Sequence, residues 1–382
     1  MIKKILLTIL LFLTISVLSF FILNLNNKIN LLKKENLNFQ TNLKNLKKQI
    51  DDYKSRDEYK INKKLEEEIK NIEKTYDQAA KTYEKLVDVK NLSKDTKKLD
   101  ADFAEILNLL SKRNYVSAEA SLKQLEKNIL NEKQKISSSF QIPKNVQESN
   151  NPPSSGYSRQ LVKTDVGDFL VDIVAADLSS TRVIVDTASD SDCKKDCPAL
   201  PLADYISRNG GYAGINASYF CPADYPSCAD KKNSFDTLLM NKNKVYFNSE
   251  NNVYSQVPAV IFLGNSVRFV RQSLEWGRDT SVDGVLAMQP LLVFEKNIVF
   301  GGDNEIKHGV KGNRSFVANR GSTVYIGVVF NANLAESAKV LKALDLDNAL
   351  NLDNGGSTAL WYGGYKVGPG RNIPNAIVFV KK

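Results

Sequence analysis

The sequence predicts an α+β fold: a mixed β-sheet domain with flanking helices, preceded by a transmembrane helix and a helical stalk. Residues 1–136 contain neither Pro nor Gly, and their apolar residues recur every three or four positions, which is typical of α-helices. After residue 158, short runs rich in β-branched and aromatic residues alternate with turn residues, as strands do. In this later part, segments 202–207 and 335–343 have a helical pattern. Several strands with few helices favour a sheet on which the helices pack.

The chain begins with an apolar segment that is long enough to cross a membrane. Residues 5–23 carry no charge, and a helix of 19 residues covers roughly the hydrocarbon core of a bilayer. Lys3 and Lys4 precede the segment, which favours a cytoplasmic N-terminus. Because the segment does not end in a small-residue cleavage site, we expect residues 1–24 to form an uncleaved signal anchor rather than a cleaved signal peptide. The protein is then a single-pass protein of the cell membrane whose C-terminal domain is extracytoplasmic.

Residues 25–136 are predicted to form a coiled-coil or helical stalk. Within 65–86, apolar residues follow one another in alternating steps of four and three, which places them on one helical seam. These residues are Leu65, Ile69, Ile72, Tyr76, Ala79, Tyr83 and Leu86. An earlier seam covers 29–53, and two more helices are expected on either side of 112–114. The seam either joins copies of the chain in a homo-oligomer or packs as a helical hairpin within one chain, and the pattern leaves both open.

A linker and one further domain follow the stalk. Residues 137–157 are polar and rich in Ser and Pro, which is typical of a linker, so the domain is expected at 158–382. Alternating or continuous apolar runs mark its strands. The expected strands are 169–175, 181–187, 212–215, 259–263, 267–270, 323–329 and 376–380.

The charge distribution argues against a nucleic-acid partner. The formal net charge is +9, but residues 1–150 hold 28 Lys and Arg against 20 Asp and Glu, whereas residues 151–382 hold 24 against 23. Nucleic-acid binding needs a basic surface on a folded domain, and the C-terminal domain has no net excess of positive charge. The basic region is instead expected near an anionic membrane surface.

All four cysteines lie in the C-terminal domain, beyond residue 190. An even number of cysteines in a translocated domain indicates disulfides, and four cysteines allow three pairings. We expect the two local pairs, Cys193–Cys197 and Cys221–Cys228. A zinc site is the alternative, although neither spacing is CxxC and the single histidine, His308, is remote in sequence. The sequence therefore predicts neither a metal nor a cofactor.

Four stretches rich in Asn, Asp, Arg and Gly lie beside predicted strand ends. They are residues 214–220, 313–317, 352–358 and 371–377. The third, Leu-Asp-Asn-Gly-Gly-Ser-Thr, reads first as a turn, because Gly adopts positive φ without steric cost and Asn tolerates it. Each stretch alone indicates little about function.

Taken in this order, the four stretches resemble those of the phosphodiester glycosidase family. Members of this family have an Asn-Gly-Gly-Phe-Phe-like stretch, an Arg followed by Thr or Ser, Leu-Asp-Gly-Gly-Gly-Ser, and a final Arg-x-x-Pro-Asn-Ala. The resemblance covers roughly residues 160–382. The chain differs in two places, since Ala217 and Ser218 replace two glycines and Asn354 replaces the first glycine of the third motif. Asn354 can keep the left-handed turn, whereas Ala217 and Ser218 do so less easily.

The resemblance implies a membrane-anchored hydrolase that cleaves glycosyl-1-phosphodiester bonds in an envelope polysaccharide or glycolipid. Cleavage at the anomeric carbon forms a cationic centre and expels a phosphate monoester, so the site needs cations for the phosphate and a carboxylate near the sugar. Arg314 and Arg371 are the predicted catalytic cations, because a guanidinium can donate two hydrogen bonds to phosphate oxygens. Asp353 is the predicted carboxylate, which stabilises the cationic centre or activates water.

The remaining motif residues are predicted to bind the glycan or glycolipid substrate. They are Asn216, Ser218, Tyr219, Asn354, Gly355, Gly356, Ser357, Thr358 and Asn375. Structural roles are the alternatives: surface ion pairs for the two arginines, an Asx-turn for Asp353, a strand-end cap for Asn216 and core packing for Tyr219.

Two questions about function stay open at the level of sequence. Asp283, Asp303 and Glu305 are further carboxylates that could supply a second catalytic group, and the sequence does not rank them. The alternative function is a non-catalytic envelope module that binds a glycan or a protein partner, with the coiled coil as its functional element.

Overall fold

The computed structural model describes residues 2–93, 95–251 and 255–382. It divides into two units, Met1–Lys74 and Thr75–Lys382, and Met1, the first residue of the predicted anchor, lies outside the described residues. The described part contains seven helices, in agreement with the predicted α+β class. They are α1 (Ile2–Ser55), α2 (Asp57–Lys90), α3 (Lys97–Ser111), α4 (Tyr115–Ser139), α5 (Leu202–Arg208), α6 (Ile306–Gly309) and α7 (Leu334–Ala343).

The first unit consists of α1 and the beginning of α2. Among the described residues, α1 is the helix that is long and apolar enough to cross a membrane, a property that a signal sequence shares. Beyond the apolar segment, the predicted seam side chains of this unit face solvent. They include Leu32, Phe39, Leu43, Leu46, Ile50, Leu65 and Ile69. Pairing of this seam with a second copy stays a prediction.

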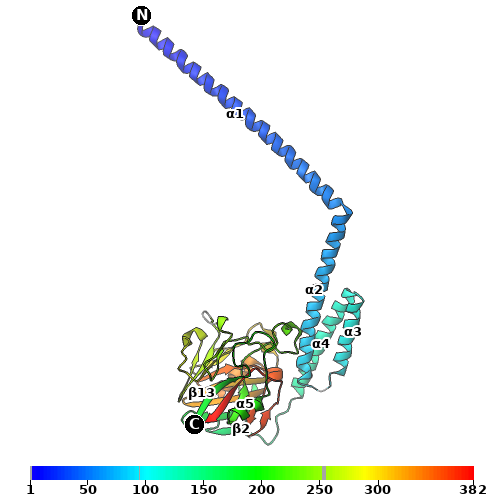
Figure 1. Cartoon of the computed structure of the whole chain (residues 1–382), viewed down its shortest axis with the longest axis vertical. Helices are drawn as coiled ribbons and strands as arrows, with labels where there is room; N and C mark the ends of the chain where they lie inside the picture. The colour runs from blue at the N-terminus through cyan, green and yellow to red at the C-terminus, as the bar shows by residue number, and fades with distance from the viewer. Residues whose placement is uncertain (1, 94, 252–254) are drawn as a thin grey trace. The chain divides into compact units, whose positions relative to one another are not determined.

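The second unit begins with three helices that lie side by side: α3, α4 and the C-terminal part of α2 (Figure 1). Ala79 and Leu86, the later seam positions of α2, are buried against α3 and α4, and the rings of Tyr83 and Phe103 lie 5.2 Å apart. This half of the predicted seam therefore packs within the chain. Helix α4 begins where the Asn114 side chain accepts a hydrogen bond from the backbone N–H of Ser117, as an N-cap does.

The C-terminal domain contains three β-sheets, which are antiparallel except for the parallel pair β1–β2. The eight-stranded sheet has the order β1 (Gln147–Glu148), β2 (Gly156–Thr164), β3 (Gly167–Asp177), β14 (Thr323–Ala332), β13 (Gly312–Arg320), β15 (Asn348–Asn351), β11 (Leu291–Phe294) and β12 (Asn297–Ile298). The second sheet has the order β7 (Tyr246–Phe247), β6 (Leu239–Met240), β10 (Gly284–Ala287), β8 (Ala259–Leu263) and β9 (Ser266–Val270). The third has the order β17 (Tyr365–Val367), β16 (Leu360–Tyr362), β5 (Gly211–Asn216), β18 (Asn375–Lys381) and β4 (Thr181–Thr187).

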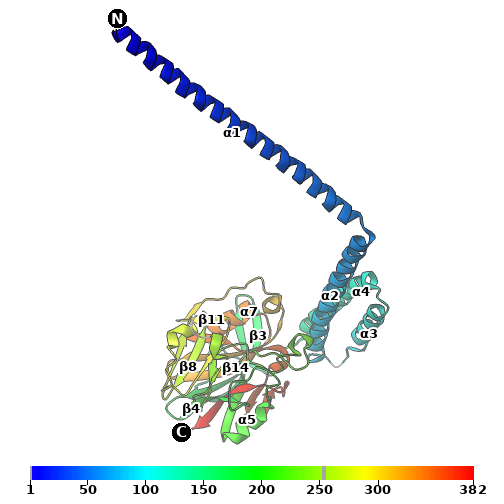
Figure 2. The same ribbon diagram turned by 45° about the horizontal axis from the view of Figure 1, so that its top comes forward.

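The main core lies where the inner faces of the three sheets meet. Ile326 and Val328 of β14, Ile215 of β5 and Phe262 of β8 are buried in one cluster. On the outer side of the eight-stranded sheet, α7 covers a second cluster, and α5 covers the outer side of the third sheet. Figure 2 shows α7 and α5 on opposite sides of the sheets.

The strands and helices predicted for the C-terminal domain are present, and the structure has further strands that the sequence did not predict. The seven expected strands correspond to β3, β4, β5, β8, β9, β14 and β18, and the two expected helices to α5 and α7. Helix α7 begins at the predicted place because the side chains of Asn333 and Glu336 cap each other's backbone N–H. The stretch 313–317 is part of β13, although its Asn-Arg-Ser sequence does not resemble a strand.

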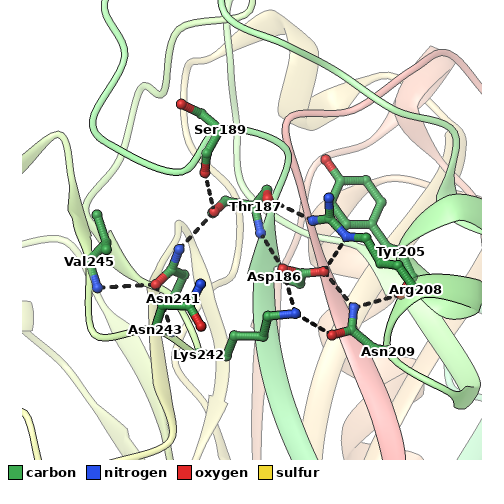
Figure 3. A network of polar contacts seen from close by, with 10 residues as sticks. All are labelled: Asp186, Thr187, Ser189, Tyr205, Arg208, Asn209, Asn241, Lys242, Asn243 and Val245. Carbon is green, nitrogen blue, oxygen red and sulfur yellow. Dashed lines mark hydrogen bonds and ion pairs between the residues drawn. The ribbon is translucent and has the colours of Figure 1, made fainter.

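A buried carboxylate joins β4, α5 and the loop that follows β6 (Figure 3). The Asp186 carboxylate contacts Arg208 Nε at 2.7 Å and Lys242 Nζ at 3.3 Å, and it accepts a hydrogen bond from the Asn209 amide. Asp186 is 3% exposed, and the two cations balance the charge that it places inside the domain. The network ties the third sheet to its covering helix.

Replacing Asp186 with Ala is expected to lower the free energy of unfolding by about 3 kcal/mol, because Arg208 and Lys242 lose their shared carboxylate. Urea denaturation of the full chain measures the change. The matched control is Asp165→Ala, which removes an exposed carboxylate 2.6 Å from Lys339 and is expected to cost under about 1 kcal/mol. Equal losses in the two variants would contradict the structural role of the Asp186 network.

Candidate active site

The Asp-Asn-Gly-Gly-Ser-Thr stretch is a tight turn between two sheets. It leaves β15, passes through a short 3₁₀ turn at Gly355–Ser357 and enters β16. Gly355 has a φ of +65°, a conformation that L-residues with a side chain adopt only with strain. The turn therefore needs glycine at this position, and it brings Asp353 and the following residues to one place beside β5.

Asp353 is a carboxyl group in an enclosed setting. Its backbone N–H donates to the Ala217 carbonyl at 2.9 Å, and its Oδ1 accepts the Asn354 N–H at 2.9 Å. Burial raises the pKa of Asp353 to about 6, against the opposing effects of a hydrogen bond from Ser357 and the positive charge of Arg371. A carboxyl group with this pKa can exchange a proton near neutral pH, which general acid–base catalysis requires.

Arg371 lies directly over Gly356. Its backbone N–H donates to the Gly356 carbonyl at 2.7 Å, and a Cβ placed on Gly356 would come within 2.5 Å of Arg371 Nη2. Glycine is thus the residue that leaves room for the guanidinium. Arg371 Nη1 lies 3.5 Å from Asp224, while its Nε is buried and, within the described part of the chain, has no hydrogen-bond partner. This guanidinium has donors left for a ligand.

Tyr225 connects Arg371 to a second cation. The Arg371 guanidinium carbon lies 5.3 Å from the centre of the Tyr225 ring, and Lys307 Nζ lies 5.9 Å from it. Both distances are within the range of cation–π attraction. Tyr225 is held in a short loop by the Cys221–Cys228 disulfide, which is formed as predicted, as is Cys193–Cys197. These two disulfides use all four cysteines of the chain.

Arg314, unlike Arg371, donates its hydrogen bonds to backbone carbonyls within the protein. It is 7% exposed, its Nε donates to the Ala332 carbonyl at 2.9 Å, and its Nη2 donates to the carbonyls of Lys307 and Val310. Burial lowers the pKa of Arg314 to about 10. The guanidinium thereby holds the segment that carries Lys307. Direct contact between Arg314 and phosphate stays a prediction, and its hydrogen bonds indicate a positioning role.

Three predicted substrate-binding residues are bonded inside the protein. Asn216 is fully buried, with its amide donating to the Asp353 carbonyl at 2.7 Å and accepting from Ser315 and from the N–H of Ala359, both at 3.0 Å. Ser218 and Asn375 are also buried and hydrogen bond to each other twice. The bonds of Asn216 correspond to its structural alternative and fix the turn that carries Asp353, whereas Ser218 and Asn375 join the end of β5 to β18.

The other predicted residues surround Asp353 more loosely. Tyr219 is partly buried, donates its hydroxyl to the Gln289 carbonyl and accepts from Asn351 at 2.7 Å, and burial raises its pKa. Asn354 accepts from the Ser315 N–H at 2.8 Å and so supports the turn. Thr358 is 5% exposed, and its hydroxyl oxygen has no hydrogen-bond partner among the described residues.

The structure adds a second carboxylate that the sequence did not suggest. Asp236 influences the charge of Asp353 electrostatically, and burial raises the pKa of Asp236 as well. It reaches the site because Phe220 and Phe235 form an isolated bridge, after which the Asp236 N–H donates to the Tyr219 carbonyl at 3.2 Å. No local motif marks Asp236, since the contact joins two loops.

The three carboxylates named from the sequence have other surroundings. Asp283 contacts Arg182 at 2.9 Å, and Asp303 contacts His308 at 2.8 Å. Glu305 is exposed next to Asp303. In the ranges that the structure describes, no three His, Cys, Asp or Glu side chains are grouped as they would be to bind a metal ion.

Comparison with known proteins finds a family match within the C-terminal domain. Residues 209–380 match the sequence model of the phosphodiester glycosidase family, which confirms the resemblance seen in the four stretches. No curated protein sequence matches the chain.

Solved structures similar to the chain include one from zebrafish and one from Synechocystis. The zebrafish N-acetylglucosamine-1-phosphodiester alpha-N-acetylglucosaminidase catalytic domain, auto-inhibited by its pro-peptide, is 16% identical, with a TM-score of 0.47, over 62% of this chain and 87% of that chain. A hypothetical protein from Synechocystis is 14% identical, with a TM-score of 0.42, over 59% of this chain. The chain spans 62% of the length of the Synechocystis protein.

The Asp353 carboxyl is expected to titrate with a midpoint near its pKa of about 6, which carboxyl NMR shifts measure. Arg371→Met removes a neighbouring positive charge and should raise the pKa, whereas Asp236→Asn removes a negative charge and should lower it.

Because the pKa of Asp353 in the folded protein exceeds the ordinary 3.8, protonated Asp353 stabilises the fold. That contribution is complete below about pH 4 and is lost as the pH rises through about 6. Unchanged midpoints in both variants would show that the three groups are not electrostatically coupled.

Proposed function

Because residues 209–380 form a domain of the phosphodiester glycosidase family, we propose that this protein hydrolyses glycosyl-1-phosphodiester bonds in an envelope polysaccharide or glycolipid. The observation that carries the proposal is that Arg371 lies over Gly356, in the turn that carries Asp353, and that its positive charge acts on the Asp353 carboxyl. A proton-exchanging carboxyl stands next to a cation with unused donors, and a glycosyl phosphodiester presents a sugar carbon next to a phosphate. The two protein groups match the two halves of the scissile linkage.

Arg371 is proposed to bind the phosphate. Its guanidinium lies over the hydrogen atoms of Gly356, and its buried Nε lacks a partner, so a phosphate oxygen can accept from it. As the bond to the sugar breaks, negative charge grows on the phosphate oxygen that leaves. A fixed guanidinium stabilises that charge more in the transition state than in the substrate, which lowers the barrier.

Asp353 is proposed to activate water. Its carboxylate takes one proton from a water molecule while the water oxygen forms a bond to the anomeric carbon. The bond between that carbon and the phosphate oxygen breaks, and the phosphate monoester leaves with the electron pair. The carboxylate also stabilises positive charge on the sugar, as in other glycoside hydrolyses. Asp236, whose backbone N–H bonds to the Tyr219 carbonyl, is the second carboxyl group in this proposal.

The other motif residues then support this arrangement. Asn216 fixes the turn, and the bond between Ser218 and Asn375 fixes the end of β5 beside it. Arg314 holds the Lys307 backbone, and Lys307 lies close to Tyr225. The Thr358 hydroxyl, which has no partner among the described residues, can bond to the substrate.

The envelope location is proposed from the first helix and the disulfides. Helix α1 is apolar and long enough to anchor the chain in a membrane, and disulfides persist in oxidising compartments outside the cytoplasm. We propose that α1 is a single-pass anchor with the catalytic domain outside. The exposed seam of α1 and α2 would then present the chain to a second copy.

Full-length protein in detergent is expected to release free sugar from at least one member of a panel of sugar-1-phosphodiesters. Asp353→Asn should reduce kcat/KM by at least about 100-fold, because the amide cannot accept the proton from water. Protonation of Asp353 should also remove activity, so kcat/KM of the wild type should decrease as the pH is lowered through about 6. Sugar release is measured by chromatography.

The matched control for this test is Asp165→Asn, an exposed carboxylate of the same domain. It should change kcat/KM less than twofold. The proposal fails if no member of the panel is hydrolysed, or if Asp353→Asn and Asp165→Asn behave alike.

A further inference from the structure

The end of helix α2 is fixed against the disulfide loop of the candidate site. Glu84 Oε1 accepts a hydrogen bond from the Ser227 N–H at 2.9 Å, and the Asp88 carboxylate bonds to the Tyr225 hydroxyl. One turn of α2 thus binds the loop whose tyrosine ring lies on Arg371. Both parts belong to the unit Thr75–Lys382.

A second attachment holds the same helices at the end of α4. Ser137 donates its hydroxyl to the Asn331 side chain at 2.7 Å, and the Asn331 amide donates to the Ser137 carbonyl at 2.9 Å. The rings of Phe140 and Phe330 are stacked 6.3 Å apart next to these bonds. Within the helices, Lys133 of α4 lies 3.8 Å from Asp88. The three-helix arrangement is therefore attached to the β-domain at two separated points, which gives the end of α2 a defined position.

Asn91, the residue after α2, reaches Gly356 in the turn that carries Asp353. A Cβ built on Gly356 would be 2.5 Å from Asn91 Nδ2 and also 2.5 Å from Arg371 Nη2. The two nitrogen atoms therefore converge on the same side of Gly356. Both are hydrogen-bond donors, and the Asn91 backbone N–H is already bonded to Val87.

Two donors, Arg371 Nε beside Gly356 and the Thr358 hydroxyl two residues further along the turn, have no hydrogen-bond partner among the described residues. Arg371 Nε is buried without a hydrogen-bond partner, and so is the hydroxyl oxygen of Thr358, a residue that is 5% exposed. A buried donor without a partner is costly, so such groups in the described structure call for a ligand that accepts hydrogen bonds. Neighbouring donors with one positive charge suit an anionic oxygen.

We propose that Asn91 binds a phosphate oxygen of the substrate beside Arg371, so that the helical region completes the substrate site of the β-domain. The inference rests on the proposed function and extends it, because it assigns a substrate contact to a residue more than 100 positions before the family domain. The side-chain amide of Asn91 supplies a hydrogen-bond donor without adding charge. The helices are then part of the enzyme's substrate recognition as well as a connection to α1.

The test uses the full chain with two substitutions at Asn91 and a matched control. Asn91→Ala removes the donor and should raise KM for a hydrolysed sugar-1-phosphodiester about tenfold, the effect of one hydrogen bond to a charged group. Asn91→Asp keeps the shape but places a negative charge beside the phosphate, and should raise KM by at least about 100-fold. Asn108→Asp makes the same change at an exposed position of α3 and should leave KM unchanged. Thermal unfolding checks that the variants are folded.

Calorimetric titration with inorganic phosphate separates this inference from the proposed function. If the wild type binds phosphate and Asn91→Asp weakens binding at least about 100-fold while Asn108→Asp does not, the inference stands even if no phosphodiester is cleaved. If the wild type hydrolyses a substrate and folded Asn91→Asp has the same KM, the proposed function stands and the inference is overturned. Absence of phosphate binding by the wild type overturns the inference as well.

Discussion

The placement of Arg371 over Gly356, next to the carboxyl of Asp353, is the arrangement on which the rest of the site depends. The guanidinium can lie there because glycine has no side chain, and the carboxyl is close enough for the positive charge to oppose the effect of burial on its pKa. Burial and a nearby cation act in opposite directions on an acid. Their balance leaves Asp353 with a pKa of about 6, where it can both hold and release a proton.

Much of the surrounding structure keeps this pair in position. Asn216 of β5 fixes the turn, and Asn375 of β18 fixes Ser218 just past the end of β5, and both asparagines are buried in strands that pair with each other. Residues of the family motifs thus divide into a small group with open donors or acceptors and a larger group that is hydrogen-bonded internally. Internal bonding restricts side-chain motion, so it would hold the proposed catalytic groups in place before a substrate binds.

The sequence predicted the architecture more completely than the site. Strand β4 and helix α7 were found because their signals are local: a run of β-branched residues in one and an Asn cap before an amphipathic segment in the other. Motif order indicated Asp353 and Arg371, which the structure brings close together, and their catalytic roles stay a prediction. Arg314 bonds to backbone carbonyls of β14 and of the segment 307–310 at the end of α6. These contacts join distant parts of the chain, so the spacing of residues in the sequence does not reveal them.

Asp236 and Asn91 were missed because tertiary contacts alone bring them to the site. Asp236 depends on a bridge between two loops, and Asn91 stands in the region that the sequence indicated as a stalk. The apolar seam of that region also serves two purposes, since its later half packs against α3 and α4 while its earlier half is exposed. Periodicity identifies a buried face but does not identify what covers it.

Hydrolysis in water enriched in oxygen-18 tests the central claim most directly, since it reports which bond of the linkage breaks. If Asp353 directs water to the anomeric carbon while Arg371 holds the leaving phosphate, mass spectrometry should find the heavy oxygen in the released sugar and none in the phosphate monoester. Heavy oxygen in the phosphate monoester would mean attack at phosphorus and would contradict the assignment of the two groups.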